Sequence, residues 1–219
     1  TLDRSSAASD VYKRQVELLL QYKAALEQGN SARTVELEKE DRKLVADLNL
    51  LTDKPVLYVC NVDEKSAVTG NAYTEAVKAA IAGEKAEMLV VAAATEADIA
   101  ELESYEERQM LLEDLGLEES GVARLIKSAY KLLNLETFFT TGADESRAWT
   151  YVRGMKAPQT AGIIHTDFEK GFIRAEVIKY DDYVALGSEK ACRDAGKIGI
   201  EGKEYVVQDG DIMHFLFNV

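Results

Sequence analysis

The stretch PVLYVCNVDE, residues 55–64, is the clearest indication of this chain's architecture. Pro55–Cys60 is an apolar run of strand length, and it stops at Asn61, which Glu64 follows three residues later. In an open α/β sheet, ligands bind outside the carboxyl ends of the strands. An amide and an acid at such a strand end are well suited to hydrogen-bond the edge of a planar base. The stretch therefore predicts one side of a nucleotide-binding site.

A second apolar run of the same character follows at Glu87–Ala93, and the residues between the two runs include a predicted helix, Glu75–Ala82. Two apolar strands joined by a helix form a βαβ unit, in which the strands are parallel. Small residues around Ala93 end the second run and would let backbone N–H groups approach a flat ligand. On their own, such residues more often serve tight packing of a helix on a strand.

The chain upstream of this unit divides into two parts. Residues 1–15, TLDRSSAASDVYKRQ, show neither helical nor alternating apolar periodicity and look like a translated sequencing-library adaptor. We expect them to be foreign to the protein, with a natural polar tail as the alternative. Helical spacing begins at Val16. Val16–Gln28 and Leu37–Leu51 are predicted to form an antiparallel helical pair, or the stump of one.

Downstream, a long helical region gives way to short alternating segments near Asn134. The helices are predicted at Ile99–Leu115 and Val122–Leu133, and Ser120 is placed to cap the second of them. The later segments are expected to form a compact α+β roll of the ubiquitin-like kind. Its strands are predicted at 137–141, 148–153, 171–179, 205–208 and 212–217, and its helices at 158–165 and 188–195.

Composition limits the class of protein. The formal net charge is −13, which argues against non-specific binding of nucleic acid, although a local basic face remains open. No apolar run is long enough to cross a bilayer, so no membrane partner is expected. Cys60 and Cys192 form no metal-binding or redox motif, and we expect reduced thiols and a cytoplasmic location.

The residues Asn61-Val62-Asp63-Glu64 resemble the base-recognition motif of P-loop GTPases, written N-K-x-D. Here Glu64 replaces the acid that reads guanine, and Val62 replaces the Lys. The longer carboxylate loses its fit to guanine, whereas the Asn61 amide can donate to adenine N7 and accept from the N6 amino group. The Val62 backbone would lie beside the ring. The alternative, of equal weight on spacing alone, is a turn in which Asn61 caps backbone groups.

Five segments together resemble the YchF, or Obg-like, ATPase family, and the resemblance covers residues 16–219. It implies a GTPase-like domain interrupted by a helical coiled-coil arm and followed by a TGS domain with a β-grasp fold. It also implies a preference for ATP and association with the ribosome. On this basis the arm ends within 16–51, the nucleotide domain occupies 52–133 and the TGS domain 134–219. The segments that carry the resemblance are 54–64, 96–102, 130–135, 161–176 and 209–219.

The chain departs from that family in one large respect, because it contains no G-x-x-x-x-G-K-[ST] loop. The stretch Gly196–Glu204 comes close to this loop but has one residue too many between its glycines, and it is interpreted as a surface loop. Without a phosphate cradle or Mg²⁺ ligands, the stabilisation needed for phosphoryl transfer is missing. We therefore expect a C-terminal fragment of an ATPase that reads the base of ATP, has no catalytic or metal-binding residues and does not hydrolyse ATP alone. The alternative is a non-catalytic module that docks on RNA or protein.

The C-terminal part offers two weaker candidates. His165 has no nucleophile or metal-ligand partner in sequence, so a capping or packing role is favoured, and His214, which alternates with Phe215 and Phe217 in a strand, is predicted to be structural. The second candidate is a basic face, for which a solvated mixed surface is the alternative. The resemblance to TGS domains favours RNA contact, and we expect a monomer. The residues assigned to this face are Arg147, Arg153, Lys156, Lys170, Arg174 and Lys179.

Overall fold

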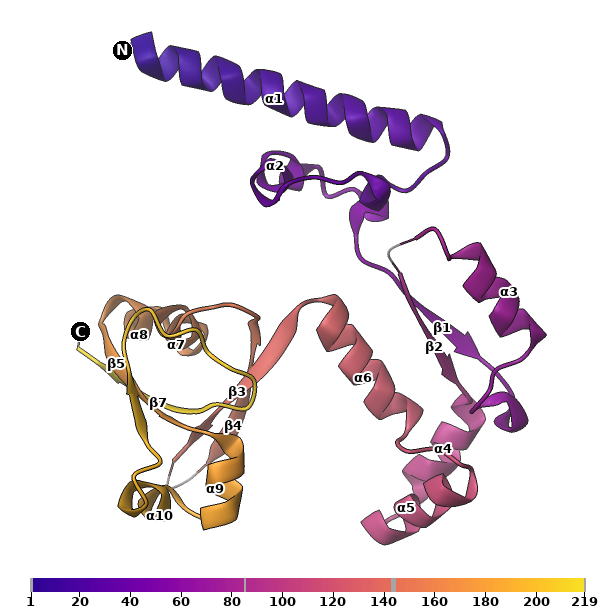
Figure 1. Cartoon of the computed structure of the whole chain (residues 1–219), viewed down its shortest axis with the longest axis vertical. Helices are drawn as coiled ribbons and strands as arrows, with labels where there is room; N and C mark the ends of the chain where they lie inside the picture. Colours follow the sequence, from indigo (N-terminus) through magenta and orange to yellow (C-terminus); the bar gives the residue numbers. More distant parts are fainter. Residues whose placement is uncertain (1, 85, 143–144, 219) are drawn as a thin grey trace. The chain divides into compact units, whose positions relative to one another are not determined.

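The computed structural model describes residues 2–84, 86–142 and 145–218, with side chains from residue 9 onward. The chain separates into two compact units, residues 1–128 and 129–219 (Figure 1). Both combine helices with β-sheet, as the mixed class predicted from the sequence requires. No helix in the described part of the chain is long and apolar enough to cross a membrane.

The first unit begins with a helical arm whose long helix, α1, spans Leu2–Glu27. It starts well before Val16, where helical spacing was predicted to begin, since neither Gly nor Pro interrupts the chain before Gly29. Arg14 and Gln15 belong to this earlier part, and they bind Asp41 and the Leu44 carbonyl oxygen at 2.6 and 2.9 Å. These two residues are therefore integrated into the arm.

The return segment of the arm is less regular than the single helix predicted at Leu37–Leu51. Asn49 adopts a left-handed conformation with φ 47°, which ends helical geometry. A small core nevertheless joins the segment to α1, built on Leu18, Tyr22, Ala32 and Val45. The elements of the segment are η1 (Ala32–Thr34), α2 (Lys39–Val45), η2 (Ala46–Leu48) and η3 (Leu51–Asp53).

The βαβ unit predicted from the two apolar runs is confirmed. Strands β1 (Leu57–Asn61) and β2 (Glu87–Val91) are parallel, with Leu57 opposite Glu87 and Asn61 opposite Val91, and α3 (Ala72–Ala80) connects them. In the described part of the chain this sheet has two strands only. Val59, at the centre of β1, is 49% exposed. Parallel sheets are normally covered on both faces, so this small sheet is unusually open.

Three helices follow β2: α4 (Ala93–Glu101), α5 (Tyr105–Asp114) and α6 (Gly121–Leu132). The single helix predicted at Ile99–Leu115 is wrong, because Ser104 starts a new helix with a reciprocal capping box to Glu107. The cap predicted for α6 is confirmed, since Ser120 Oγ accepts the Ala123 N–H at 3.1 Å.

The second unit is built on a five-stranded sheet in the order β4-β3-β7-β5-β6. Its central pair, β3 and β7, is parallel, whereas the other neighbours are antiparallel. Four of the five strands lie within or close to predicted strands. Their bounds are β3 (Leu135–Thr141), β4 (Ser146–Val152), β5 (Phe172–Ile178), β6 (Gly199–Glu201) and β7 (Ile212–Phe217).

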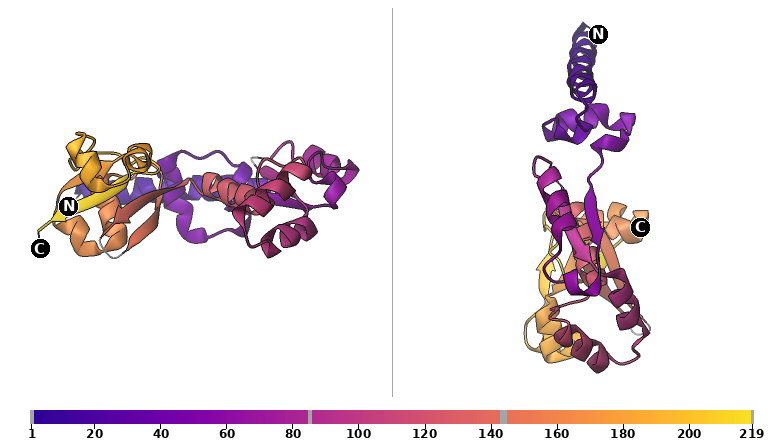
Figure 2. Two further views of the ribbon diagram at one scale, coloured as in Figure 1. Left: turned by 90° about the horizontal axis from the view of Figure 1, so that it is seen from below. Right: turned by 90° about the vertical axis from the view of Figure 1, so that its right-hand side faces the viewer.

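Helices cover the two faces of this sheet, as the views in Figure 2 show. On one face, α7 (Ala157–Ile164) packs on the main core, which includes Phe138, Tyr151 and Phe215. On the other face, Cys192 of α10 (Glu189–Asp194) packs with Ile178 and Ile212 in a smaller cluster. Alternate residues of a strand point to opposite faces, so Ile212 and Met213 enter different clusters.

Two sequence predictions for this unit are wrong, and two short helices were missed. Tyr205–Gln208 is no strand, since only an isolated bridge joins Val206 to Lys156. The Gln208 amide instead binds the Val206 carbonyl oxygen, and the Gln208 N–H donates to Asp211. The predicted loop Gly196–Glu204 contains β6, which pairs with β5. Two short helices, α8 (Thr166–Lys170) and α9 (Tyr180–Leu186), were not predicted.

Candidate nucleotide-base site

The candidate site lies where β1 and β2 end. Asn61 is the last residue of β1, and its Oδ1 atom accepts the N–H of Ala93, the first residue of α4, at 3.0 Å. An N–H requires an acceptor, so this bond also fixes which amide atom faces Ala93. The structure thus brings together two of the four predicted base-site residues. Asn61 therefore caps a backbone N–H, as the alternative prediction held, but that N–H belongs to α4 and not to a local turn.

Val62 extends the strand ladder by one residue, because its N–H donates to the Val91 carbonyl oxygen at 2.9 Å. That N–H is therefore not available to a ligand. Only the carbonyl group and the half-buried side chain of Val62 remain to lie beside a base.

The two acids of the motif have different environments. Asp63 Oδ1 accepts the Ser66 N–H at 2.9 Å and so caps the short turn η4 (Glu64–Ser66). Glu64 is exposed, and its carboxylate makes no hydrogen bond or ion pair within the described residues. Of the two, Glu64 is therefore the carboxylate that can bind a ligand without breaking a protein contact.

Sequence reasoning missed the residue that anchors the next helix. The Glu96 carboxylate accepts the N–H groups of Gly121 and Val122 at 2.6 and 3.1 Å, so it caps α6 from α4. A Cβ atom at Gly121 would lie 2.9 Å from Val91 Cγ1 and 2.8 Å from the Glu96 carboxylate. Gly121 is thus the residue type that permits this close approach. A Gly directly after Ser120 at a helix start was the available signal.

A polar junction ties the arm to β1. Arg33 donates to Glu84 at 2.9 Å, and the Tyr58 hydroxyl donates to the same carboxylate at 3.2 Å. The Arg33 guanidinium, acting against partial burial, holds the pKa of Glu84 below its usual range. Tyr58 lies three residues before Asn61 in β1, so the strand that ends in the candidate site is fixed at its other end by the arm.

The groups at this strand end can form hydrogen bonds with the edge of a base. Parallel strand ends bring one amide, one free carboxylate and the start of a helix to the same edge of the sheet. No group of His, Cys, Asp and Glu in the described part of the chain is arranged to hold a metal ion. The stretch Gly196–Glu204 lies in the other unit, partly in β6.

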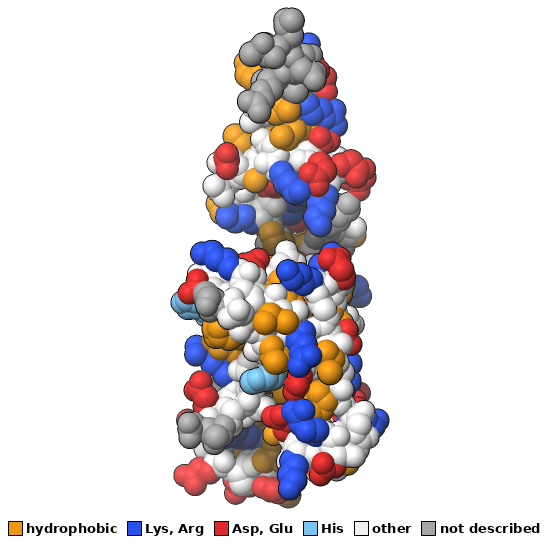
Figure 3. Space-filling view, turned by 90° about the vertical axis from the view of Figure 1, so that its left-hand side faces the viewer, with side chains coloured by type: hydrophobic (Ala, Val, Ile, Leu, Met, Phe, Trp, Pro, Cys, Tyr) orange, Lys and Arg blue, Asp and Glu red, His pale blue; other side chains and the backbone are white. Residues whose placement is uncertain are grey.

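The basic face predicted in the second unit is largely neutralised. Arg153 pairs with Glu136 at 2.7 Å, and Arg147 lies over the Trp149 ring at 4.2 Å. In Figure 3, basic and acidic side chains are mixed over the visible surface. Arg174 alone of the predicted basic residues has no such contact within the described chain. The remaining pairs are Lys156–Glu204, Lys170–Asp167 and Lys179–Asp211.

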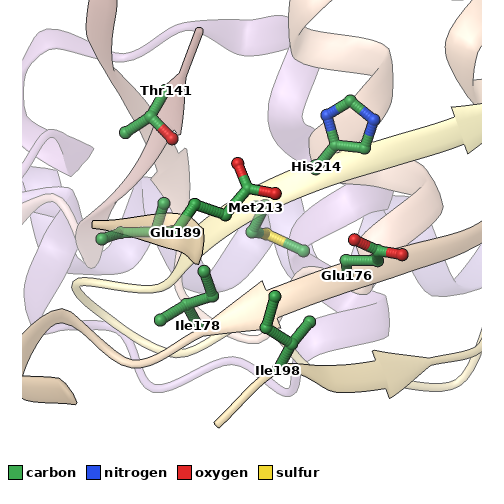
Figure 4. A pocket seen from close by; sticks show the side chains of 8 residues that line it. Thr141, Glu176, Ile178, Glu189, Ile198, Met213 and His214 are labelled. Carbon is green, nitrogen blue, oxygen red and sulfur yellow. The ribbon is translucent and has the colours of Figure 1, made fainter. Parts of the chain in front are cut away.

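Both histidines are exposed, and each belongs to a short helix end or a strand. His165 Nδ1 accepts the Asp167 N–H at 3.2 Å and caps α8, which confirms the predicted capping role. His214 projects from β7 opposite Glu176 of β5, beside a shallow hollow that also contains Glu189 and Thr141 (Figure 4). Glu176 and Glu189 both bind Arg193, at 2.9 and 3.0 Å, so their charges are already compensated.

Comparison with known proteins adds family context. Residues 135–218 match the sequence model of the family YchF-GTPase_C, described as a protein of unknown function (DUF933). The chain is 54% identical over 205 residues to the ribosome-binding ATPase YchF of Bacillus subtilis, which covers 93% of this chain and 56% of that protein. It is 46% identical over 216 residues to the protein of the same name from Haemophilus ducreyi, covering 99% of this chain and 59% of that protein.

Two further comparisons extend beyond bacteria. The chain is 47% identical over 172 residues to Obg-like ATPase 1 of Rattus norvegicus, covering 77% of this chain and 43% of that protein. The solved structure of the Schizosaccharomyces pombe YchF GTPase superposes with a TM-score of 0.81 at 34% identity, covering 96% of this chain and 55% of that one. The chain thus spans a little over half the length of its Bacillus and Haemophilus relatives.

Proposed function

Because the chain belongs to the YchF/Obg-like ATPase family, whose C-terminal portion it matches, we propose that it supplies the base-recognition side of an ATP site. Phosphate binding and hydrolysis, with Mg²⁺, would depend on the part of a family member that this chain does not match. In this proposal Asn61 and Glu64 select the base, and the Val62 carbonyl group lies beside it. Ala93 holds Asn61 in place through its backbone N–H. The chain alone is expected to be inactive.

The observation that carries the proposal is the hydrogen bond from the Ala93 N–H to Asn61 Oδ1. It uses one lone pair of the amide oxygen and none of the Nδ2 hydrogens. Adenine offers an acceptor at N7 and a donor at N6, and an asparagine amide can satisfy both. The bound orientation of Asn61 therefore leaves the donor and acceptor that adenine requires.

A chimera tests this proposal. The region of the Bacillus subtilis relative that this chain matches is replaced by the chain, and the relative supplies the remaining part of the ATPase. We expect the chimera to bind ATP more tightly than GTP and to hydrolyse it, and a Glu64→Ala variant to lose discrimination between the two nucleotides. ATP hydrolysis by the 219-residue chain alone, above the rate of its own Glu64→Ala variant, would contradict the proposal.

A second candidate function concerns residues 134–219, which we propose to be a ubiquitin-like β-grasp TGS domain that contacts ribosomal or transfer RNA. The order β4-β3-β7-β5-β6 with a parallel central pair supports the fold. The name of the Bacillus subtilis relative, a ribosome-binding ATPase, supports the partner. On this proposal the protein works in the cytoplasm as a monomer, and residues 16–51 are the end of a coiled-coil arm.

Charge reversal separates this function from the first. Arg174 makes no ion pair within the described chain, so Arg174→Glu should weaken co-sedimentation with ribosomes in a salt-dependent way without unfolding the domain. Arg153→Glu should weaken co-sedimentation in the same way, and it also breaks the ion pair between Arg153 and Glu136. Co-sedimentation unchanged by both substitutions, and unchanged between low and high salt, would exclude RNA contact through this face.

A further inference from the structure

The most strongly charged segment of the chain follows strand β2. Residues 93–120, which form α4, α5 and the loop after them, contain ten acidic residues and one basic residue, a net charge of −9. Two of these carboxylates cap helices and one pairs with Lys127. The remaining seven are exposed and have no hydrogen bond or ion pair within the described residues: Asp98, Glu101, Glu103, Glu106, Glu113, Asp114 and Glu118.

The position of two of these acids does not favour folding. Glu113 and Asp114 lie in the last turn of α5, and that turn contains no basic residue. The C-terminal end of a helix carries partial negative charge, so carboxylates there are destabilising. Mutual repulsion within the −9 segment adds to this effect. A cationic partner would relieve both.

A groove runs along the same segment between α4, α5 and the start of α6. Ile99 and Leu112 form its buried floor, while Tyr105 and Val122 line it with side chains that are 69% and 53% exposed. Glu118 stands at its edge. The one basic residue in the groove, Arg108, donates to the Leu102 carbonyl oxygen at 2.9 and 2.7 Å and so closes the end of α4.

We propose that this groove docks a basic amphipathic helix of a partner protein. Apolar side chains of such a helix would cover Tyr105 and Val122, and its Lys and Arg residues would face Glu118 at the edge and the other free carboxylates of the same segment. Helix-in-groove binding uses apolar anchors at i, i+3, i+4 and i+7. The charge of the segment excludes nucleic acid as the occupant, since phosphates would be repelled. None of the residues that line the groove is assigned to either proposed function.

The test uses the full 219-residue chain and a fluorescein-labelled peptide of about 18 residues with Leu at helical spacing and Lys elsewhere. Anisotropy titrations should show saturable binding that weakens as NaCl rises from about 50 to about 300 mM. A scrambled peptide of equal composition should bind at least about fivefold more weakly, because it has no apolar face. Single-stranded RNA of equal length, added as a competitor, should displace little of the labelled peptide.

One groove variant, one variant of the acidic segment and one matched control locate the site. Tyr105→Ala and Glu101→Gln/Glu118→Gln should each weaken peptide binding about fivefold. All three side chains are exposed, so the fold should tolerate their replacement. Asp181→Asn/Asp194→Asn, which removes the same charge from the other unit, should bind as the unchanged chain does. Equal affinities for both peptides, or equal losses in the groove and control variants, would overturn the proposal.

Discussion

Asn61 Oδ1 and the backbone N–H of Ala93 are 3.0 Å apart, and this contact joins the end of β1 to the first turn of α4. The first N–H groups of a helix have no partner within the helix. Ala92, the residue preceding α4, provides no side-chain cap. Asn61 thus acts as a cap supplied from another strand, and its capping role can be separated from a role in base recognition.

Asn61→Asp and Asn61→Ala should separate the two roles. Aspartate keeps an oxygen acceptor for the Ala93 N–H but has no amide hydrogens for adenine N7. We expect Asn61→Asp to retain the protection of the Ala93 amide from hydrogen exchange, and Asn61→Ala to lower the stability of this helix start by about 1 kcal/mol. Both variants of the chimera should lose ATP affinity. Unimpaired ATP binding by Asn61→Asp would restrict Asn61 to capping.

Substitution of the two neighbouring acids, Asp63 and Glu64, should change the free energy of unfolding to different extents. Asp63→Ala removes the cap on the Ser66 N–H and should loosen η4, at a cost of up to about 1 kcal/mol. Glu64→Ala removes an exposed group with no partner within the described residues and should change the free energy of unfolding by less than about 0.5 kcal/mol. Urea titrations followed by circular dichroism provide the measurement. A larger loss in Glu64→Ala than in Asp63→Ala would reverse our assignment of the two carboxylates.

Glu96→Ala should destabilise α6 by about 1–2 kcal/mol, since it removes the acceptor for the Gly121 and Val122 N–H groups. Hydrogen exchange of those two amides should accelerate first. Asp98→Ala is the matched control, because Asp98 lies two residues further along α4, is exposed and makes no ion pair within the described residues. Similar exchange in both variants would show that Glu96 does not hold this helix.

The parts of the fold that local pattern controls were predictable. The parallel pair β1 and β2 follows from two apolar runs joined by a helix, and the Ser120 cap follows from a hydroxyl placed before a helical stripe. The position of Asn61 at the end of a strand follows equally from the sequence pattern. Sequence spacing does not reveal which group the Asn61 amide contacts, because its partner Ala93 is 32 residues away.

The failures come from polar side-chain contacts and backbone conformations that apolar periodicity does not encode. Tyr205–Gln208 has the composition of a strand, but buried Asp211 takes the Gln208 N–H and the Tyr205 hydroxyl, at 2.9 and 2.6 Å. A side chain thus accepts the Gln208 N–H, which in a strand would donate to a backbone carbonyl oxygen. Asn49 ends the helix predicted through Leu51 by adopting positive φ, which its residue type permits but does not require.

The same buried carboxylate predicts a large stability effect. Asp211 Oδ1 lies 2.6 Å from Lys179 Nζ, and the carboxylate is fully buried whereas the lysine is half exposed. Removing one partner of a buried pair typically costs about 3 kcal/mol. Asp211→Ala should therefore unfold the second unit at markedly lower urea concentration. Tyr205→Phe, which removes one hydrogen bond to the same group, should cost only about 1 kcal/mol.

Tyr151 predicts how stability changes at alkaline pH. Burial, together with the nearby Glu136 carboxylate 2.7 Å from its hydroxyl, raises the pKa of Tyr151 far above its ordinary value of 10.0. The unfolded chain therefore releases this proton first, so the contribution to stability is complete below about pH 10 and declines as pH rises above it. Tyr151→Phe should flatten that decline. The slope of unfolding free energy against pH between about 9.5 and 11 is the quantity to compare.

The openness of the small parallel sheet has a practical consequence for anyone producing this chain. Within the described residues, β1 and β2 pair only with each other, and Val59 is half exposed on β1. Unpaired strand edges with apolar side chains recruit further strands from other molecules. Purified alone, the chain should self-associate as its concentration rises. Co-expression with the remaining part of a bacterial relative should suppress that association by occupying the free edge.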